Sequence, residues 1–479
     1  MLRLPACLLL TAAISVACGS DKDIFGKRNE PSTTPVATVE PESPATPTSA
    51  MTADGKRTVA SIIDQDDGNS YLVNYRELID SLGLAAYHQR GQHGKKIKIA
   101  VLDNGFSGLN NSLGKRLPPD TELVKSALDQ MDNTTHGTKL AEIVYALSSG
   151  SNRYQEDAES PEIILMNTFG FSNFKNAVSE VIKRKVDIVL YAQVWQYFGN
   201  FDGRGFINAE VNRATKAGVL WINAAGNMGR STYNSAININ SDGVSVTLPH
   251  EGRFVRFTVP KDQTRVAVAL SWNDNRDTTN FATDQDLDLI LEDAFHNQLG
   301  VGRLRQGGPA GNKQDPLYSA YPRETITTML NAGTYLLRAE AISRNFNGAS
   351  QLRLSIDGEG VVVLDSPSDN SVGIPADNAT VLTVGAGDVD YSGKMPASAN
   401  GKAKPELQVV SSEVKFSDGE IHRGTSAASA IVAAGMVVFN GTYGKQSRAQ
   451  VIDLMTRGIL ATPATRQATT PTFKLGSPR

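Results

Sequence analysis

Two different patterns of apolar and polar residues divide the chain. Between about residues 96 and 224, apolar runs typical of buried strands alternate with segments of helical period. Strand–helix alternation of this kind is typical of a mostly parallel sheet with helices on both faces, so we expect an α/β fold. The predicted strands are Lys96–Leu102, Val186–Val194 and Val219–Ala224, and the predicted helices are Tyr75–Tyr87, Thr135–Leu147, Phe174–Lys185 and a segment around Ile207–Ala214.

The helical period stops after Asn227. From about Ser235 to Asp357, short alternating segments are separated by Gly and Asn clusters, which predicts a small antiparallel β-sandwich. The α/β pattern returns at Ala379–Gly385 and continues through two helices, so the sandwich is expected to be an insertion. The expected division is a signal peptide over 1–18, a disordered tether over 19–57, an α/β domain over 58–234 and 358–479, and the inserted sandwich over 235–357.

The first eighteen residues have the features of a targeting signal. Arg3 precedes an apolar run from Leu8 to Ala17, which is too short to span a bilayer as a structural helix. Small residues before Cys18 resemble the lipobox of bacterial lipoproteins, and an ordinary secretory signal is the alternative. We therefore expect an extracytoplasmic protein of the bacterial cell envelope, either an outer-membrane or surface lipoprotein or a secreted protein.

Composition narrows the range of partners. The net charge of −3 gives no basic surface for nucleic acid, and the 40% hydrophobic and 20% charged residues are ordinary for a globular protein. Of the 2 cysteines, Cys7 leaves with the signal and Cys18 carries the expected lipid, so the mature fold has no disulfide. We expect a monomer that contacts a membrane only through its N-terminal lipid anchor.

Four short islands carry groups suited to acyl transfer. An acid, a base, an amide donor and a hydroxyl nucleophile each stand where a loop meets a strand end or a helix start. Each group also has a structural alternative: a turn aspartate, a capping histidine, a turn asparagine and an N-cap serine. The islands are Val101–Gly105 with Asp103, Thr135–Thr138 with His136, Ala224–Asn227 with Asn227, and Gly424–Ala428 with Ser426.

The order of these islands resembles that of the subtilisin-like serine peptidases, the subtilase family. The resemblance runs from about Leu84 to Leu460, interrupted by the sandwich, and Ser371–Ala376 resembles the family's segment beside the specificity pocket. It implies a serine endopeptidase that acts on proteins or peptides through an acyl-enzyme, and it requires no cofactor. The roles implied are Asp103, His136 and Ser426 as catalytic triad, Asn227 in the oxyanion hole, and Ala192, Gln193 and Gly226 in substrate binding.

Several positions depart from the family pattern. Ala430 replaces the usual proline after the nucleophile, and Lys139–Glu142 replaces the usual His-Val-Ala-Gly. In the segment that normally pairs with the substrate backbone, Gln193 and Trp195 could narrow the cleft. His422, four residues before Ser426, is a rival base. The alternative function is therefore a catalytically impaired subtilase-fold protein that binds or scaffolds other molecules.

A run of alternating carboxylates lies inside the predicted sandwich. It lacks the glycine and glutamate positions of an EF-hand loop. Calcium binding in a bent loop is one interpretation, and a solvated edge that blunts strand pairing is the other. The carboxylates are Asp284, Asp286 and Asp288.

Overall fold

The structure is a computed structural model of the chain. It describes residues 15–17, 71–157, 159–279, 281–306, 317–365, 369–397, 403–462, 464 and 470–478. The predicted lipid site at Cys18 and the predicted tether lie outside these residues, as does the predicted signal peptide apart from Ser15–Ala17.

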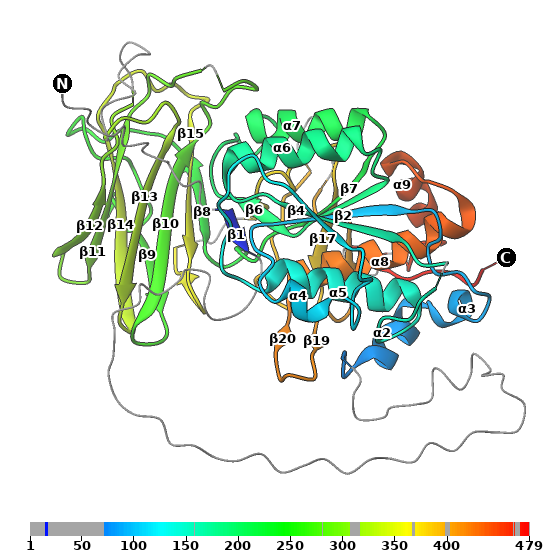
Figure 1. Ribbon diagram of the computed structural model, residues 1–479. Helices are drawn as coiled ribbons and strands as arrows, with labels where there is room; N and C mark the ends of the chain where they lie inside the picture. Colours follow the sequence, from blue (N-terminus) through cyan, green and yellow to red (C-terminus); the bar gives the residue numbers. More distant parts are fainter. Residues whose placement is uncertain are drawn as a thin grey trace, which may run out of the picture.

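A nine-stranded sheet forms the larger part of the molecule (Figure 1). Every pair of neighbouring strands in it is parallel except the short pair β21–β22 at one edge. The central strands are buried on both faces, as their continuous apolar runs predict. In sheet order the strands are β21 (Ala461–Thr462), β22 (Thr472–Phe473), β18 (Leu407–Val409), β17 (Leu382–Ala386), β7 (Leu220–Ala224), β5 (Ile188–Tyr191), β2 (Lys98–Asp103), β4 (Glu162–Asn167) and β3 (Glu122–Val124).

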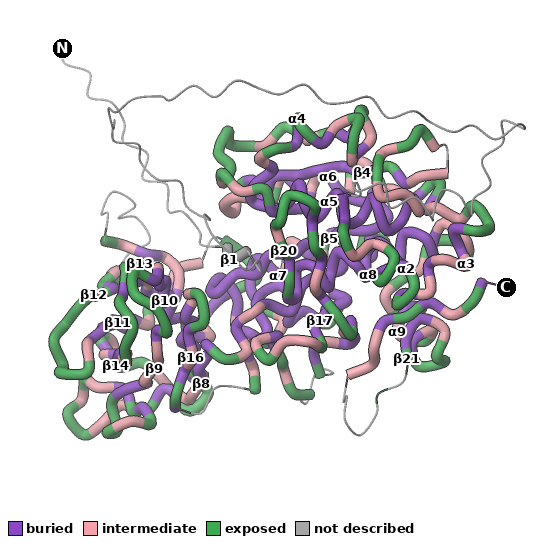
Figure 2. The backbone as a smooth tube through the Cα atoms, turned by 90° about the horizontal axis from the view of Figure 1, so that it is seen from below, coloured by how far each residue is buried: buried purple, intermediate pink, exposed green. Residues whose placement is uncertain are grey.

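Helices cover both faces of this sheet (Figure 1). On one face lie α6 (Gly170–Lys183) and α7 (Phe206–Lys216), and on the other α5 (His136–Ser149) packs beside α8 (Thr425–Tyr443). The 19-residue helix α8 is apolar enough to cross a membrane, but 89% of its most apolar window is buried in the protein, so it is a core helix (Figure 2). The remaining helices are α2 (Tyr75–Leu82), α3 (Ala85–His88), α4 (Leu109–Ser112) and α9 (Arg448–Thr456).

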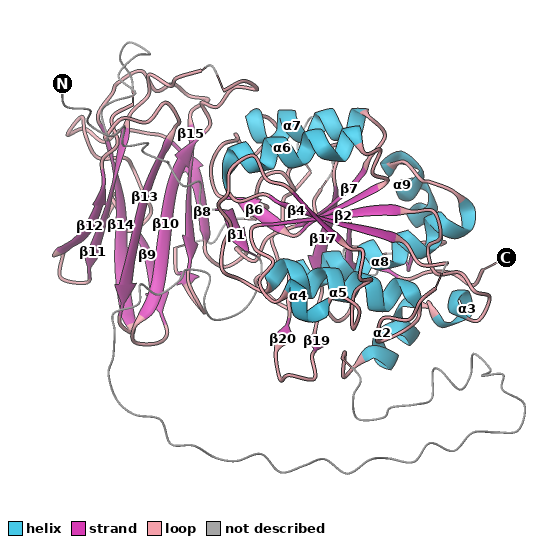
Figure 3. Cartoon of the chain, in the orientation of Figure 1, coloured by secondary structure: helices cyan, strands magenta, loops and turns pink. Residues whose placement is uncertain are grey.

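Two antiparallel sheets pack face to face beside the α/β part, and no helix is assigned among their described residues (Figure 3). Their inner faces share one apolar core that includes Val268, Leu270 and Trp272. One sheet has the order β13 (Arg323–Leu330), β10 (Thr264–Trp272), β15 (Gln351–Asp357) and β8 (Thr232–Ala236). The other has the order β12 (Gln298–Gly302), β11 (Leu287–Asp293), β14 (Gly333–Ala341), β9 (Val255–Val259) and β16 (Val362–Val363).

The predicted fold class, an α/β fold with an antiparallel sandwich, is confirmed, but local details differ. The predicted helix Tyr75–Tyr87 is two helices, because Gly83 between them takes a left-handed conformation with φ 73°. The sandwich strands extend past the predicted limits, from Thr232 to Val363. β4 was not among the predicted strands, although its apolar run is typical of a buried strand.

Four short strands lie outside these sheets and form two separate pairs. The two strands β19 (Val414–Lys415) and β20 (Ile421–His422) form a hairpin shortly before α8. β6 (Gln193–Trp195) continues the chain direction just beyond β5. The backbone of β1 (Ser15–Ala17) runs antiparallel along β6, with Val16 opposite Val194 (Figure 1). The edge of β6 therefore accepts an extended segment.

The sandwich contacts the α/β part through a polar interface centred on Arg353 of β15. This buried guanidinium donates to the Val372 carbonyl oxygen at 2.8 Å and lies 3.5 Å from the centroid of the Phe201 ring. It also donates to the backbone and side-chain oxygens of Asn370. The sandwich thereby holds the segment around residues 370–372, which leads into the predicted pocket segment.

The core of the sandwich makes a direct prediction about stability. Leu270 is fully buried in β10, so Leu270→Ala should lower the free energy of unfolding by about 2–5 kcal/mol. Met329→Ala, on the exposed side of the neighbouring strand β13, should change it by less than about 0.5 kcal/mol. Denaturant unfolding followed by tryptophan fluorescence can measure both, since Trp272 lies in this core. Equal losses for the two variants would contradict the core assignment.

Candidate active site

Asp103 ends the buried strand β2 and has no exposed surface. Its Oδ1 accepts hydrogen bonds from the backbone N–H groups of Asn104 at 2.8 Å and Gly105 at 3.3 Å. Its Oδ2 lies 2.6 Å from Nδ1 of His136 and accepts from Nε2 of Gln193 at 3.1 Å. Four nitrogen partners therefore fix the orientation of a carboxylate that water does not reach, as a buried charge requires.

His136 is the first residue of α5, and the close approach of that helix to β2 brings its ring to Asp103. The approach depends on Gly137, because a Cβ atom there would lie 2.7 Å from the Cβ of Asp103 and 2.7 Å from the Gly105 carbonyl oxygen. With Nδ1–H donated to the carboxylate, the neutral ring presents Nε2 as a proton acceptor. Among the described residues, this buried Nε2 has no hydrogen-bond partner.

Ser426 is the second residue of α8, close to the positive end of that helix. Its hydroxyl donates to the Ala192 carbonyl oxygen at 3.2 Å rather than to His136. Ala192 directly precedes Gln193, which bonds to Asp103, so two consecutive residues link the serine to the Asp103–His136 pair. Hydrogen bonds of a catalytic serine are often formed only in the complex with substrate.

Asn227 follows strand β7 and is fixed by Thr425, the residue before Ser426. Its Oδ1 accepts from the Thr425 backbone N–H at 3.1 Å and from the Thr425 hydroxyl at 3.0 Å. The backbone N–H of Gly226 in turn donates to that hydroxyl at 3.2 Å. Because Oδ1 is held in this way, the Nδ2 amide nitrogen of Asn227 is oriented as a hydrogen-bond donor beside the start of α8.

The structure therefore brings Asp103, His136, Asn227 and Ser426 together at the carboxyl ends of β2 and β7 and the N-termini of α5 and α8. Gln193 points toward the Asp103–His136 pair, whereas Trp195 does not. The indole of Trp195 is fully buried, donates to the Tyr191 hydroxyl at 2.9 Å and packs against aromatic rings including Phe174 and Phe198.

Part of the chain that contributes to this site also matches a model of a known protein family. Residues 94–276 match the Peptidase_S8 model, described as the subtilase family. This part of the chain thus resembles a subtilase domain. The match includes Asp103, His136 and Asn227, and Ser426 lies beyond its last residue.

Curated relatives of the chain are bacterial proteases. The chain is 24% identical over 197 residues to the thermostable alkaline protease of Halalkalibacterium halodurans, covering 34% of this chain and 52% of that protein. It is 22% identical over 189 residues to subtilisin amylosacchariticus of Bacillus subtilis subsp. amylosacchariticus and to subtilisin E of Bacillus subtilis, in each case covering 37% of this chain and 47% of the relative. The chain thus spans about half the length of these relatives.

Two solved structures align with most of this chain at low sequence identity. The CspB protease of Clostridium perfringens aligns with a TM-score of 0.48 at 12% identity, covering 84% of this chain and 96% of that one. A cold-adapted subtilisin-like serine proteinase aligns with a TM-score of 0.37 at 13% identity, covering 80% and 89%.

His422, the rival base, lies against His136 in the candidate site. The two rings stack with centroids 5.9 Å apart and planes 19° from parallel. Nε2 of His422 lies 2.8 Å from a Glu420 carboxylate oxygen, so this nitrogen is already paired. Burial lowers the pKa of His422, and the bond to Glu420 opposes that shift. The His422 ring thus packs beside that of His136, and it is His136 that holds the bond to Asp103.

The two departures after the His-Gly-Thr motif belong to one buried network. Lys139 donates to the Tyr71 hydroxyl at 2.5 Å and to Asp418 at 2.5 Å, while Tyr71 donates to Glu142. Glu142 also accepts from Ser112. Burial raises the pKa of Tyr71, and the Glu142 carboxylate raises it further, so the hydroxyl stays protonated. Tyr71 therefore links Lys139 and Glu142 of α5, two departures from the family pattern that the sequence alone did not explain.

Two of the three candidate calcium ligands, Asp286 and Asp288, have separate partners. Asp288 pairs with Arg303 at 3.0 Å, and Asp286 accepts from the Gln306 backbone N–H at 3.2 Å. Burial raises the pKa of Asp286 to about 6. Within the described part of the chain, no group of three or more His, Cys, Asp or Glu side chains is arranged to hold a metal. Calcium binding by Asp284, Asp286 and Asp288 stays a prediction.

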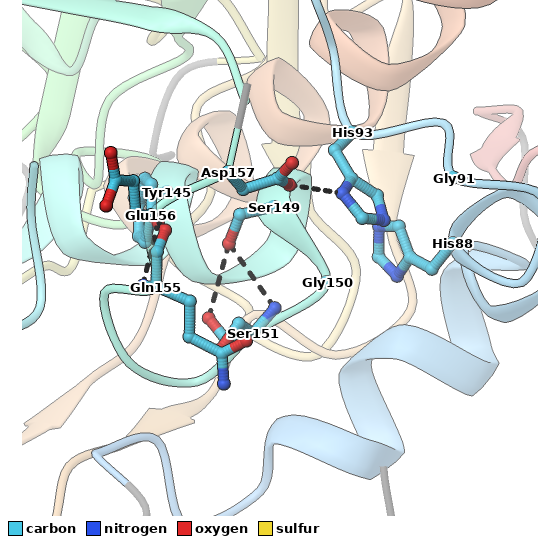
Figure 4. A pocket seen from close by; sticks show the side chains of 10 residues that line it. All are labelled: His88, Gly91, His93, Tyr145, Ser149, Gly150, Ser151, Gln155, Glu156 and Asp157. Carbon is cyan, nitrogen blue, oxygen red and sulfur yellow. Dashed lines mark hydrogen bonds and ion pairs between the residues drawn. The ribbon is translucent and has the colours of Figure 1, made fainter. Parts of the chain in front are cut away.

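A separate cavity of about 220 Å³ lies at the far end of α5 (Figure 4). His88 and His93 meet edge to face in its wall, and Nδ1 of His93 lies 2.5 Å from Asp157. The His88 ring packs beside Gly150, the C-cap of α5, and burial lowers its pKa to about 4. His88 is therefore a neutral ring packed against the end of this helix.

The buried network makes a prediction about stability. Tyr71→Phe should lower the free energy of unfolding by about 1–3 kcal/mol, because Lys139 and Glu142 each lose a partner away from water. The matched control is Tyr154→Phe. This variant removes the hydroxyl of a partly buried tyrosine whose ring lies tilted against that of Tyr145, and no hydrogen bond of this hydroxyl is found within the described residues. Thermal unfolding of both variants checks the difference, and equal stability of the two would contradict the network.

Proposed function

We propose that this protein is a serine endopeptidase that hydrolyses peptide bonds through an Asp103–His136–Ser426 triad. The observation that carries the proposal is the 2.6 Å contact between Asp103 and His136, with Ser426 at the start of the adjoining helix. The subtilase match and the protease relatives support the same activity.

In the proposed mechanism, the Ser426 hydroxyl turns from the Ala192 carbonyl toward Nε2 of His136. His136 takes the hydroxyl proton while Oγ attacks the substrate carbonyl carbon. Asp103 keeps the ring in the tautomer that leaves Nε2 free and stabilises the imidazolium that forms. His136 then protonates the departing amine, which leaves an acyl-enzyme on Ser426. Water, activated by the same imidazole, hydrolyses that ester.

The negative charge on the carbonyl oxygen needs donors that are in place before the reaction. The Nδ2 amine of Asn227 and the backbone N–H of Ser426 supply them in this proposal. Thr425 holds Oδ1 of the Asn227 side-chain amide in place. The Nδ2 donor therefore needs little reorientation when negative charge develops on the substrate carbonyl oxygen.

Protein or peptide chains are the proposed substrates. The edge of β6 already pairs with an extended segment, since Ser15–Ala17 runs antiparallel along Gln193–Trp195. A substrate strand added at this edge would pass Ala192, whose carbonyl bonds to Ser426. Ala192, Gln193 and Gly226 are therefore the proposed substrate-binding residues.

The remaining features belong to the same proposal. We place the enzyme outside the cytoplasm, held at the cell envelope by lipid on Cys18, and acting as a monomer. The sandwich between residues 235 and 357 is proposed as a separate domain without catalytic groups, since all four groups come from the α/β part. Calcium, if bound at Asp284–Asp288, would have a structural role there.

An impaired scaffolding protein is the second candidate. It is favoured by the position of Gln193, whose amide bonds to Asp103 and lies 3.5 Å from Nδ1 of His136. The two candidates differ in whether Ser426 reacts.

The first functional prediction concerns the nucleophile. Ser426→Ala should reduce hydrolysis of casein or a peptide mixture by several orders of magnitude, because triad members act as a unit. Ser429→Ala, one turn further along α8, is the matched control and should retain activity, since its hydroxyl only bonds to the Ser426 carbonyl. Retained activity in Ser426→Ala would contradict Ser426 as the nucleophile, whereas no activity in the unaltered protein would favour the scaffolding candidate.

The second concerns the amide donor. Asn227→Ala should lower kcat by roughly a hundred- to a thousandfold and change KM far less, because the donor acts on the transition state. Steady-state kinetics on one peptide substrate separate the two constants. A change confined to KM would instead assign Asn227 to substrate binding or to structure.

A further inference from the structure

Val194 lies between Gly226, which precedes the proposed oxyanion donor Asn227, and Gly373. The residue is fully buried at the centre of β6. A Cβ atom on Gly226 would lie 3.4 Å from its Cγ2, and one on Gly373 would lie 2.5 Å from its Cβ. The Val194 side chain therefore packs tightly against Gly373 and leaves room for little more than a Cβ atom at Gly226.

The walls of this space are tied to the reactive groups. Gly226 directly precedes Asn227, and its N–H bonds to the Thr425 hydroxyl. Gly373 donates to the Ala225 carbonyl oxygen at 3.2 Å, and the following Ile374 exchanges backbone bonds with Trp195 at 2.7 and 3.2 Å. The space filled by Val194 thus lies beside the position where the attacked carbonyl would sit.

This position determines which substrate side chain would meet Val194. If Ser426 attacks a carbonyl whose oxygen points to Asn227, the residue carrying that carbonyl passes Gly226. Its side chain, on the N-terminal side of the cleaved bond, then extends toward Gly226, Gly373 and Val194. Protein interiors are close-packed, so the branched Val194 side chain leaves no equivalent volume for a large substrate side chain.

We propose that Val194 restricts this site to substrates with glycine or alanine immediately before the cleaved bond. The inference rests on the proposed peptidase function and adds the substrate class. Val194 is a specificity-determining residue: it excludes large side chains by volume and takes no part in the chemistry.

The experiment uses a peptide anilide series that differs only in the residue before the cleaved bond: Gly, Ala, Leu or Phe. The unaltered protein should show a kcat/KM for Ala at least about 100-fold above that for Leu or Phe, since a single methylene is worth about 10–200-fold. Val194→Gly should raise kcat/KM for Leu and Phe by about 10-fold or more while leaving that for Ala within about threefold. Val194→Ala should give an intermediate result and serves if the glycine variant folds poorly.

The matched control is Val189→Ala, which shortens a fully buried valine in the neighbouring strand β5 away from this space. It should keep the preference of the unaltered protein. Labelling of Ser426 with a small fluorophosphonate, whose reaction does not require a large pocket, is run on every variant. Absent labelling would contradict the proposed function itself.

Two outcomes in which Ser426 is labelled would overturn the role of Val194 alone. In one, the unaltered protein shows no preference for peptides with a small residue before the cleaved bond. In the other, Val194→Gly and Val194→Ala leave that preference unchanged. Labelling without cleavage of any peptide by the unaltered protein or either Val194 variant would overturn it as well. If Val189→Ala shifts the preference as far as Val194→Ala does, general loosening of the fold accounts for the effect, and the inference fails.

Discussion

The buried carboxylate of Asp103 is the group on which the rest of the site depends. A charge with no exposed surface is costly unless hydrogen bonds replace the lost water. Its four partners come from its own loop, the start of α5 and the strand β6. Satisfying this one group therefore fixes the relative positions of three segments, and the buried helix α8 completes the site by placing Ser426 against Ala192.

Much of this arrangement could be predicted because parallel sheets gather functional groups at the carboxyl ends of their strands. Asp103 and Asn227 each follow an apolar run, and His136 and Ser426 each begin a helix of apolar period, so each could be placed at the same sheet edge. The long apolar strands were predictable for the same reason. The edge strand β12 was not, because it is mostly exposed and contains two glycines, Gly300 and Gly302.

Contacts between distant residues with no shared pattern could not be predicted. Nothing in the sequence joins Tyr71 to Lys139 and Glu142, or places the ring of His422 on that of His136. From the sequence, both Gln193 and Trp195 could narrow the cleft. In the structure, Gln193 faces Asp103, whereas Trp195 packs into the aromatic core. Both residues lie in the short strand β6, which follows a break in the strand at Ala192, and no local propensity indicates that break or the contacts of either side chain.

The central claim is that His136, oriented by Asp103, activates Ser426. The most direct measurement is the rate of covalent labelling by a fluorophosphonate, with the modified residue located by peptide mass spectrometry. The account predicts a single label on Ser426 that forms roughly a thousandfold or more slowly in Asp103→Asn and in His136→Ala. An unlabelled Ser426 in the folded, unaltered protein, or a labelling rate that these two substitutions leave unchanged, would contradict it.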